Sequence, residues 1–142
     1  MKTVKKLSVI ALSIILIIVI FSGVTYNQAG NVKVDIDVQD NGTIYIVINN
    51  PTSFNYELEE FKAEIYIGNM AVATVSLPNP INVPAGKTVR APADVKINIV
   101  SALLAALSGG DEWASVYYKL VPKLGPISLL AHETSKNETV DW

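Results

Sequence analysis

The stretch Ile48–Asn69, "INNPTSFNYELEEFKAEIYIGN", breaks one β-strand pattern at a proline and soon resumes another. Pro51 fixes its own φ near about −65°, removes a ladder donor and disfavours helix at Asn50, so the strand predicted for residues 43–49 has to end there. Three apolar side chains then alternate along the resumed strand: Phe54, Tyr56 and Leu58. We interpret the break as a corner between strands rather than an interruption at an active site.

Two predicted hairpins flank this corner. Val32–Val38 alternates strictly between apolar and charged residues, and the Asn-Gly pair that follows is a strong hairpin signal, because both residues adopt positive φ at little cost. The strand at residues 43–49 carries apolar residues on both faces, which predicts a central position in a sheet. Phe61–Ile67 and Ala71–Leu77 repeat this plan across a turn at residues 68–70.

The remainder predicts more strands and one helix. Residues 77–92 hold Pro78, Pro80, Pro84 and Pro92, which suits an edge or a corner between sheets. A strand is expected at residues 94–100. A helix follows at residues 101–107 and ends at Gly109-Gly110; since it carries no charge, we expect it to be largely buried. Closing strands are expected at residues 113–121 and 125–135.

These elements predict an all-β protein: an antiparallel, immunoglobulin-like β-sandwich of about seven strands with one short helix. The predicted divisions are a membrane anchor or uncleaved signal segment at residues 1–24, a linker at 25–30, the sandwich at 31–136 and a tail at 137–142.

The N-terminal segment predicts a membrane location. Lys2, Lys5 and Lys6 precede an uncharged run at residues 7–24, and about 18 to 20 apolar residues in a helix match a hydrocarbon core of about 30 Å. Lysines on this side predict a cytoplasmic N-terminus and an extracytoplasmic domain in a single-pass protein. A cleaved signal peptide, which would release the domain as a secreted protein, stays the alternative; its usual pattern of small residues at the cut is not found.

Charge and composition exclude some functions. All 13 acidic residues of the 142-residue chain follow the apolar run, while three of the 11 basic ones precede it. An acidic domain without a basic stripe is a poor partner for nucleic acid. The chain has no cysteine, which excludes disulfides, thiolate metal sites, cysteine nucleophiles and a lipoprotein anchor.

From about Asn31 to His132 the sequence resembles the WHy (water stress and hypersensitive response) domain of the LEA14-like (LEA type 2), or late embryogenesis abundant, proteins. The resemblance rests on an Asn-Pro that ends a strand, a nearby aromatic and leucine, a Leu-Pro-x-Pro stretch and a Pro-Ala-Gly turn. The motif residues are Asn50, Pro51, Phe54, Leu58, Pro78, Pro80, Pro84 and Gly86. It implies a β-sandwich, a role in water stress or desiccation, and no enzyme. The membrane segment is a departure from soluble LEA14-like proteins.

Few residues indicate chemistry. His132 is the only histidine, and its neighbour Glu133 would point to the opposite strand face, so we predict no catalytic residues. Asp35, Asp37 and Asp40 could offer oxygen ligands to calcium, but a solvated strand face explains them better, and we predict no metal or cofactor. "ELEE" at residues 57–60 suits a charged edge that discourages edge pairing.

Two further features allow functional interpretations. Asn41 and Asn137 match the glycosylation sequon, although turn chemistry alone accounts for Asn41, and Pro51 excludes Asn50. Leu103, Leu104 and Leu107 of the predicted helix could line an apolar groove, with core packing as the plainer account.

Three functions follow as hypotheses. The preferred one is a non-catalytic, membrane-anchored domain that protects or binds envelope components under stress, through a protein or lipid partner that the sequence does not define. The second is a carrier or scaffold whose apolar groove binds lipid or peptide. The third is a structural subunit that assembles through an exposed edge strand.

Overall fold

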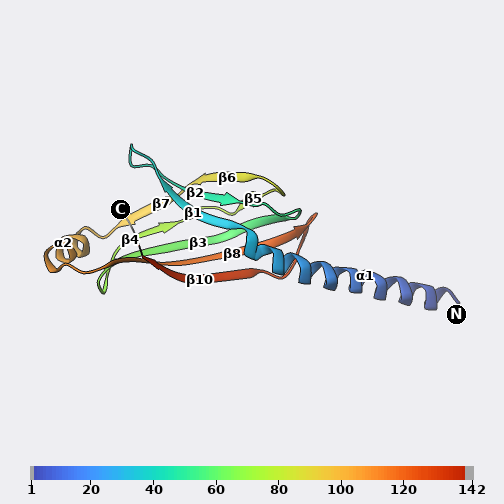
Figure 1. Cartoon of the computed structure of the whole chain (residues 1–142). Coiled ribbons are helices and arrows are strands. Elements are labelled where there is room, and N and C mark those ends of the chain that lie inside the picture. Colours follow the sequence, from blue (N-terminus) through green and yellow to red (C-terminus); the bar gives the residue numbers. More distant parts are fainter. Residues whose placement is uncertain (1, 140–142) are drawn as a thin grey trace.

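The computed structural model describes the backbone of residues 2–139 and the side chains of residues 13–17 and 19–139. The strands form two antiparallel sheets, one of three strands in the order β1-β2-β6 and one of seven, with β10-β8-β3-β4-β7 as its main path, β5 beside β3 and β9 beside β8. The predicted all-β sandwich is confirmed, and Figure 1 shows α1 leaving one end of it and α2 lying at the other. The elements are α1 Lys2–Gln28, η1 Ala29–Asn31, β1 Lys33–Val38, β2 Ile44–Asn49, β3 Asn55–Ile67, β4 Met70–Ser76, β5 Ile81–Val83, β6 Thr88–Pro92, β7 Asp94–Ile97, α2 Ile99–Ser108, β8 Glu112–Leu124, β9 Ile127–Ser128 and β10 His132–Thr139.

The core lies between the sheets. Ile46 and Ile48 of β2 face Leu58 and Phe61 of β3, and all four side chains are buried. Each such side chain contributes about 1.5–3 kcal/mol when it is fully removed from water. Without cysteines, this core has to hold the sandwich together.

The first hairpin has the predicted strands and a different turn. Gln39 N donates to Thr43 O at 2.8 Å, and Gly42 has a φ of 85°. Asn41 does not adopt positive φ, contrary to expectation; its side-chain oxygen instead accepts from Thr43 N at 3.0 Å. The connection is therefore a three-residue loop with one left-handed glycine. β2 is central in its sheet, as predicted.

The strand after Pro51 is longer than its sequence pattern indicated. β3 runs as one strand from Asn55 to Ile67, with a register shift against β8 between Leu58 and Glu60. Because β3 lies inside the large sheet, the interpretation of residues 57–60 as a charged edge is wrong. Glu57 pairs instead with Lys123 across to β8, at 3.5 Å.

The proline-rich segment crosses between the sheets, as expected. β5 pairs with β3 of the large sheet, while β6 pairs with β2 of the small one. Pro78 and Pro80 are exposed in the loop before β5, and Pro84 lies in the turn between β5 and β6. Pro92 ends β6, which is an edge strand of its sheet.

The helix α2 begins earlier and lies more exposed than predicted. Its cap is Asn98, whose side chain accepts from Ser101 N at 3.0 Å, so Ile99 and Val100 belong to the helix and not to the preceding strand. Gly109 ends it, as expected. The expectation of a largely buried helix is wrong, because Ala105 is its one buried residue.

The C-terminal segment also differs from prediction. β9 covers only Ile127–Ser128, and a loop at residues 129–131 precedes β10, which starts at His132. Residues 137–139, predicted as tail, continue β10 in register with β8. Residues 140–142 of that predicted tail lie outside the described part.

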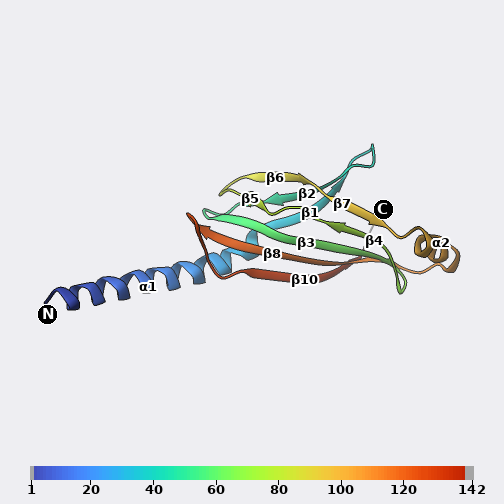
Figure 2. The same ribbon diagram turned by 180° about the vertical axis from the view of Figure 1, so that it is seen from behind.

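The predicted linker at residues 25–30 is helical instead. α1 continues to Gln28, followed directly by η1, and both Thr25 and Ala29 are buried. Within the described residues, one helix is long and apolar enough to cross a membrane, over Ser13–Asn31. The N-terminal lysine side chains lie outside the described ones. Figure 2 shows from behind that α1 extends away from the sandwich.

Candidate functional site: a cleft between the sheets

An apolar cleft opens between the two sheets along β1 and β10. Its volume is about 550 Å³, within the range of about 300–1,000 Å³ that is typical of ligand sites. Side chains of β1 and β2 form one wall: Val34, Ile36, Val38 and Ile44. Buried side chains of β3, β4 and β8 form the floor, including Phe61, Val75, Ala114 and Val116.

The cleft results from the unequal width of the sheets. The small sheet ends at β1, whereas the large sheet continues through β8 to β10. The cleft-lining residues of β10, Lys136, Glu138 and Thr139, are polar and exposed. Because the large sheet extends beyond the small one, its inner face at this side is not covered by a strand of the small sheet.

One ion pair lies at the rim of the cleft. Lys136 Nζ is 2.6 Å from Glu138 Oε1, and each side chain keeps nearly half of its area in water. The hydrogen bond from Lys136 to Glu138 raises the pKa of the lysine above its usual value, against the opposing effect of desolvation, and the charges of Glu138, Tyr118 and Asp35 raise it further. Lys136 is therefore charged at neutral pH. The rim beside the apolar floor thus carries an ion pair in which the two charges neutralise each other.

The motif residue Asn50 is structural. It is fully buried, and its side-chain nitrogen donates to three carbonyls, those of Phe54 at 2.8 Å, Val83 at 3.1 Å and Pro84 at 3.2 Å. Its oxygen accepts from the backbone nitrogen and the hydroxyl of Thr52. This one amide joins the turn after β2 to the turn after β5.

The other motif residues surround the same corner or pack into the core. Gly86 has a φ of 69°, and its nitrogen donates to Thr52 O at 3.1 Å. Phe54 packs edge-on against Phe21 of α1, with ring centroids 5.1 Å apart. Leu58 is fully buried, while Pro51 and Pro84 are exposed. None of the motif residues lines the cleft.

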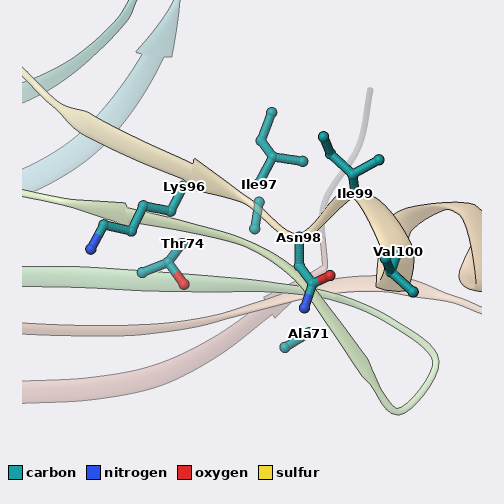
Figure 3. A pocket seen from close by; sticks show the side chains of 8 residues that line it. Ala71, Thr74, Lys96, Ile97, Asn98, Ile99 and Val100 are labelled. Atoms are coloured by element: carbon teal, nitrogen blue, oxygen red, sulfur yellow. The ribbon is translucent and has the colours of Figure 1, made fainter.

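The helix leucines form neither the possible groove nor the core packing that the sequence favoured. Leu103, Leu104 and Leu107 expose 63%, 48% and 86% of their areas, so they close no cleft. Beside α2 lies a separate shallow depression of about 530 Å³ between β4 and β7, where Asn98 points toward Ala71 while Ile97 and Ile99 point away from it (Figure 3). Lys96 is its one charged lining residue.

Both sequons lie on the surface. Asn41 is exposed in the β1–β2 turn, and Asn137 is exposed on β10, opposite Ser115. Their accessibility is compatible with glycosylation, and the modification itself stays a prediction.

The residues considered for chemistry are dispersed. The His132 ring lies 4.9 Å from that of Tyr26, at the start of β10. Asp37 accepts from Arg90 and from Gln39, each at 2.7 Å. Among the described residues, no group of three or more His, Asp or Glu side chains is placed to hold a metal ion.

Sequence reasoning missed the cleft. Its floor residues, such as Phe61 and Val116, follow ordinary core alternation. The available signal was the polar inner face of the last strand, at Thr134, Lys136 and Glu138, which indicates a strand that the second sheet leaves uncovered.

Comparison with known proteins adds little. No protein-family model matches the chain, and no curated protein does. A crystal structure of a protein from Archaeoglobus fulgidus is similar over 78% of this chain and 96% of that one, with 14% identity and a TM-score of 0.38. The sheets and α1 of this chain by themselves define its class, an all-β sandwich behind an N-terminal apolar helix that could span a membrane. Membership of the LEA14-like family stays a prediction.

Proposed function

We propose that the protein is a non-catalytic, membrane-anchored binding module that holds an extended apolar peptide segment in the cleft, on the extracytoplasmic side. The observation that carries the proposal is the free edge of β1 above an apolar floor. A role in stress protection, which the family resemblance implies, stays a prediction beside it.

The backbone of β1 has unused hydrogen-bonding capacity at the cleft. Gln39 donates to Thr43 O across the β1–β2 ladder, and the pattern of an antiparallel pair alternates, so Asp37 and Asp35 also face β2. Val34, Ile36 and Val38 therefore direct their backbone groups toward the free edge. An extended peptide can add a strand there and satisfy these groups.

The side chains favour an apolar occupant with alternating residues. Those of Val34 and Ile36 point into the cleft, over Phe61 and Val116. A strand added beside β1 would direct every second side chain to this floor and the others to water. The ion pair of Lys136 and Glu138, on the inner face of β10, borders this floor at the rim of the cleft.

The helix α1 supports the proposed location. Six of its large apolar side chains expose about half of their area or more, Ile14, Ile15, Leu16, Ile17, Val19 and Ile20, which suits surrounding lipid. The three lysines before the apolar run favour a cytoplasmic N-terminus, so that the sandwich lies outside.

Fluorescence anisotropy on the full chain in lipid nanodiscs tests the proposal. The probe is a labelled synthetic peptide of about seven residues with alternating valine and threonine, the length of one strand. Val38→Pro removes a donor from the free edge at a site with 54% exposure, and proline is tolerated on edge strands. We expect this variant to bind at least tenfold more weakly than the wild type.

The control is Leu107→Ser, which removes an exposed apolar side chain of α2 that does not line the cleft and should leave binding unchanged. Equal binding by all three proteins would contradict the proposal. Two other results would identify a different occupant. Binding of a fatty acid that persists in Val38→Pro but is lost in Ala114→Phe would indicate a lipid carrier, and self-association abolished by Val38→Pro would indicate assembly through the edge strand.

A further inference from the structure

The sandwich is fixed to α1 without a flexible linker. Thr25 is fully buried, and its carbonyl accepts from the hydroxyl of Tyr56 at 2.7 Å. Phe21 packs on Phe54, and Tyr26 packs on His132. Three separate contacts over two turns of helix therefore determine how the sandwich is oriented on α1.

These contacts lie where the apolar run ends. The run reaches Val24, yet Phe21, one turn earlier, already touches the sandwich. A bilayer around the run therefore has its surface level with the near end of the domain. Tyr26, 38% exposed, lies at that level, where aromatic residues with a polar group are favoured.

The loops at this end suit a membrane surface. The turns at residues 50–54 and 84–87 and the loop at 125–131 contain no acidic residue, and Lys87 is exposed among them. Ile127 and Leu130 expose 48% and 63% of their areas. In Figures 1 and 2 the connection from β8 to β10 lies beside α1.

The connections at the opposite end of the sandwich carry acidic residues. Its connections carry Asp40 and Asp111, and Glu112 begins β8 there. The loops near α1 are thus uncharged apart from Lys87, while acidic residues gather at the far end, so the end at α1 is the one that suits a bilayer surface.

We propose that the end of the sandwich at α1 docks on the same bilayer that α1 spans, with Ile127 and Leu130 in the interfacial layer and Lys87 among the headgroups. This rests on the proposed membrane anchor. Docking would hold the sandwich in one orientation and direct the far end of the cleft, at Val38 and Thr139, toward the aqueous side. The anchor makes the docking intramolecular, so a small apolar contact suffices.

Site-specific fluorescence in vesicles tests this proposal. The chain contains no cysteine, so Leu130→Cys and Ile127→Cys each provide a single site for an environment-sensitive label in the full protein. The vesicles contain phosphatidylcholine and phosphatidylglycerol, with and without nitroxide-labelled lipid. Leu107→Cys on α2 is the matched control, since Leu107 is an exposed leucine at the far end.

We expect both loop labels to emit at shorter wavelength than the control label and to be quenched several-fold more strongly by nitroxide lipid. Loop labels that behave like the one at position 107, on protein that floats with the vesicles, would overturn the docking and leave the anchor intact. Protein that fails to float would overturn the anchor, and the docking with it.

Discussion

The hydroxyl of Tyr56 in β3 donates a 2.7 Å hydrogen bond to the backbone carbonyl of Thr25 in the last turn of α1. Both residues are buried, so water cannot readily replace this donor. The contact therefore joins the apolar helix to the central strand of the large sheet and makes the two a single unit.

Tyr56→Phe should destabilise the protein by about 1 kcal/mol, because it removes the donor of a buried hydrogen bond. Denaturant unfolding of the full chain in micelles measures this. Tyr45→Phe is the control, since the Tyr45 ring packs under Arg90 and its hydroxyl makes no hydrogen bond among the described residues; we expect it to change the free energy of unfolding by less than about 0.5 kcal/mol. Equal effects of the two substitutions would contradict the role of the Tyr56 hydroxyl.

Asn50→Ala should destabilise the fold more strongly, by about 3 kcal/mol or more, since three carbonyls lose one buried donor group. Asn49→Ala changes the neighbouring residue, which is exposed and makes one long side-chain contact with Thr88, at 3.4 Å. Comparison of the two unfolding midpoints measures the difference. A cost for Asn50→Ala no larger than that for Asn49→Ala would show that the corner does not depend on this amide.

Much of the fold could be predicted because its signals are local. Alternation determined β1 and β2, and Pro51 determined where β2 ends. The position of β3 inside the large sheet was beyond prediction, since its glutamates pair with lysines on β8 that are distant in sequence. The helical structure of residues 25–30 was not predicted for a similar reason. Their short polar composition indicates a linker, whereas contacts with Tyr56 and His132, which are distant in sequence, hold them as helix and η1.

The candidate site was predicted less well. Leu103, Leu104 and Leu107 have the composition of a buried helix, and nothing in a local pattern reveals that α2 lies at the end of the sandwich and packs through Ala105. The cleft depends on how far one sheet extends beyond the other, which is a property of strand order. Asn50 was identified as a motif residue, but its three acceptors come from two segments, Phe54 after β2 and Val83–Pro84 at the end of β5, that only the fold brings together.

Gly110→Ala should destabilise the protein because two backbone segments meet there. A Cβ on Gly110 would lie 3.0 Å from Cα and N of Gly68, and its φ of 133° is unfavourable for any other residue. We expect a loss of at least about 1 kcal/mol, measured by thermal unfolding. Gly30→Ala, with open space around its added methyl group, should be close to neutral. Matching behaviour of the two variants would show that the β3–β4 turn and the chain before β8 do not pack as closely as described.

Tyr117 offers a test of electrostatics on the outer surface of the large sheet. Its hydroxyl donates to Glu133 Oε1 at 2.9 Å, and this hydrogen bond is the main reason why its pKa is raised to about 12, with smaller contributions from burial and Glu60. The pKa of Tyr117 is higher in the folded state than in the unfolded state. The hydrogen bond to Glu133 therefore stabilises the folded state below about pH 10, and this stabilisation is lost as the pH rises toward 12. Glu133→Gln should return the pKa of Tyr117 toward 10, measured by NMR titration of ring-labelled tyrosine.

The control is Glu138→Gln, which removes a carboxylate that pairs with Lys136 instead, so the same titration should show an unchanged pKa of Tyr117. If Tyr117 titrates alike in both variants, the charge of Glu133 does not cause the shift.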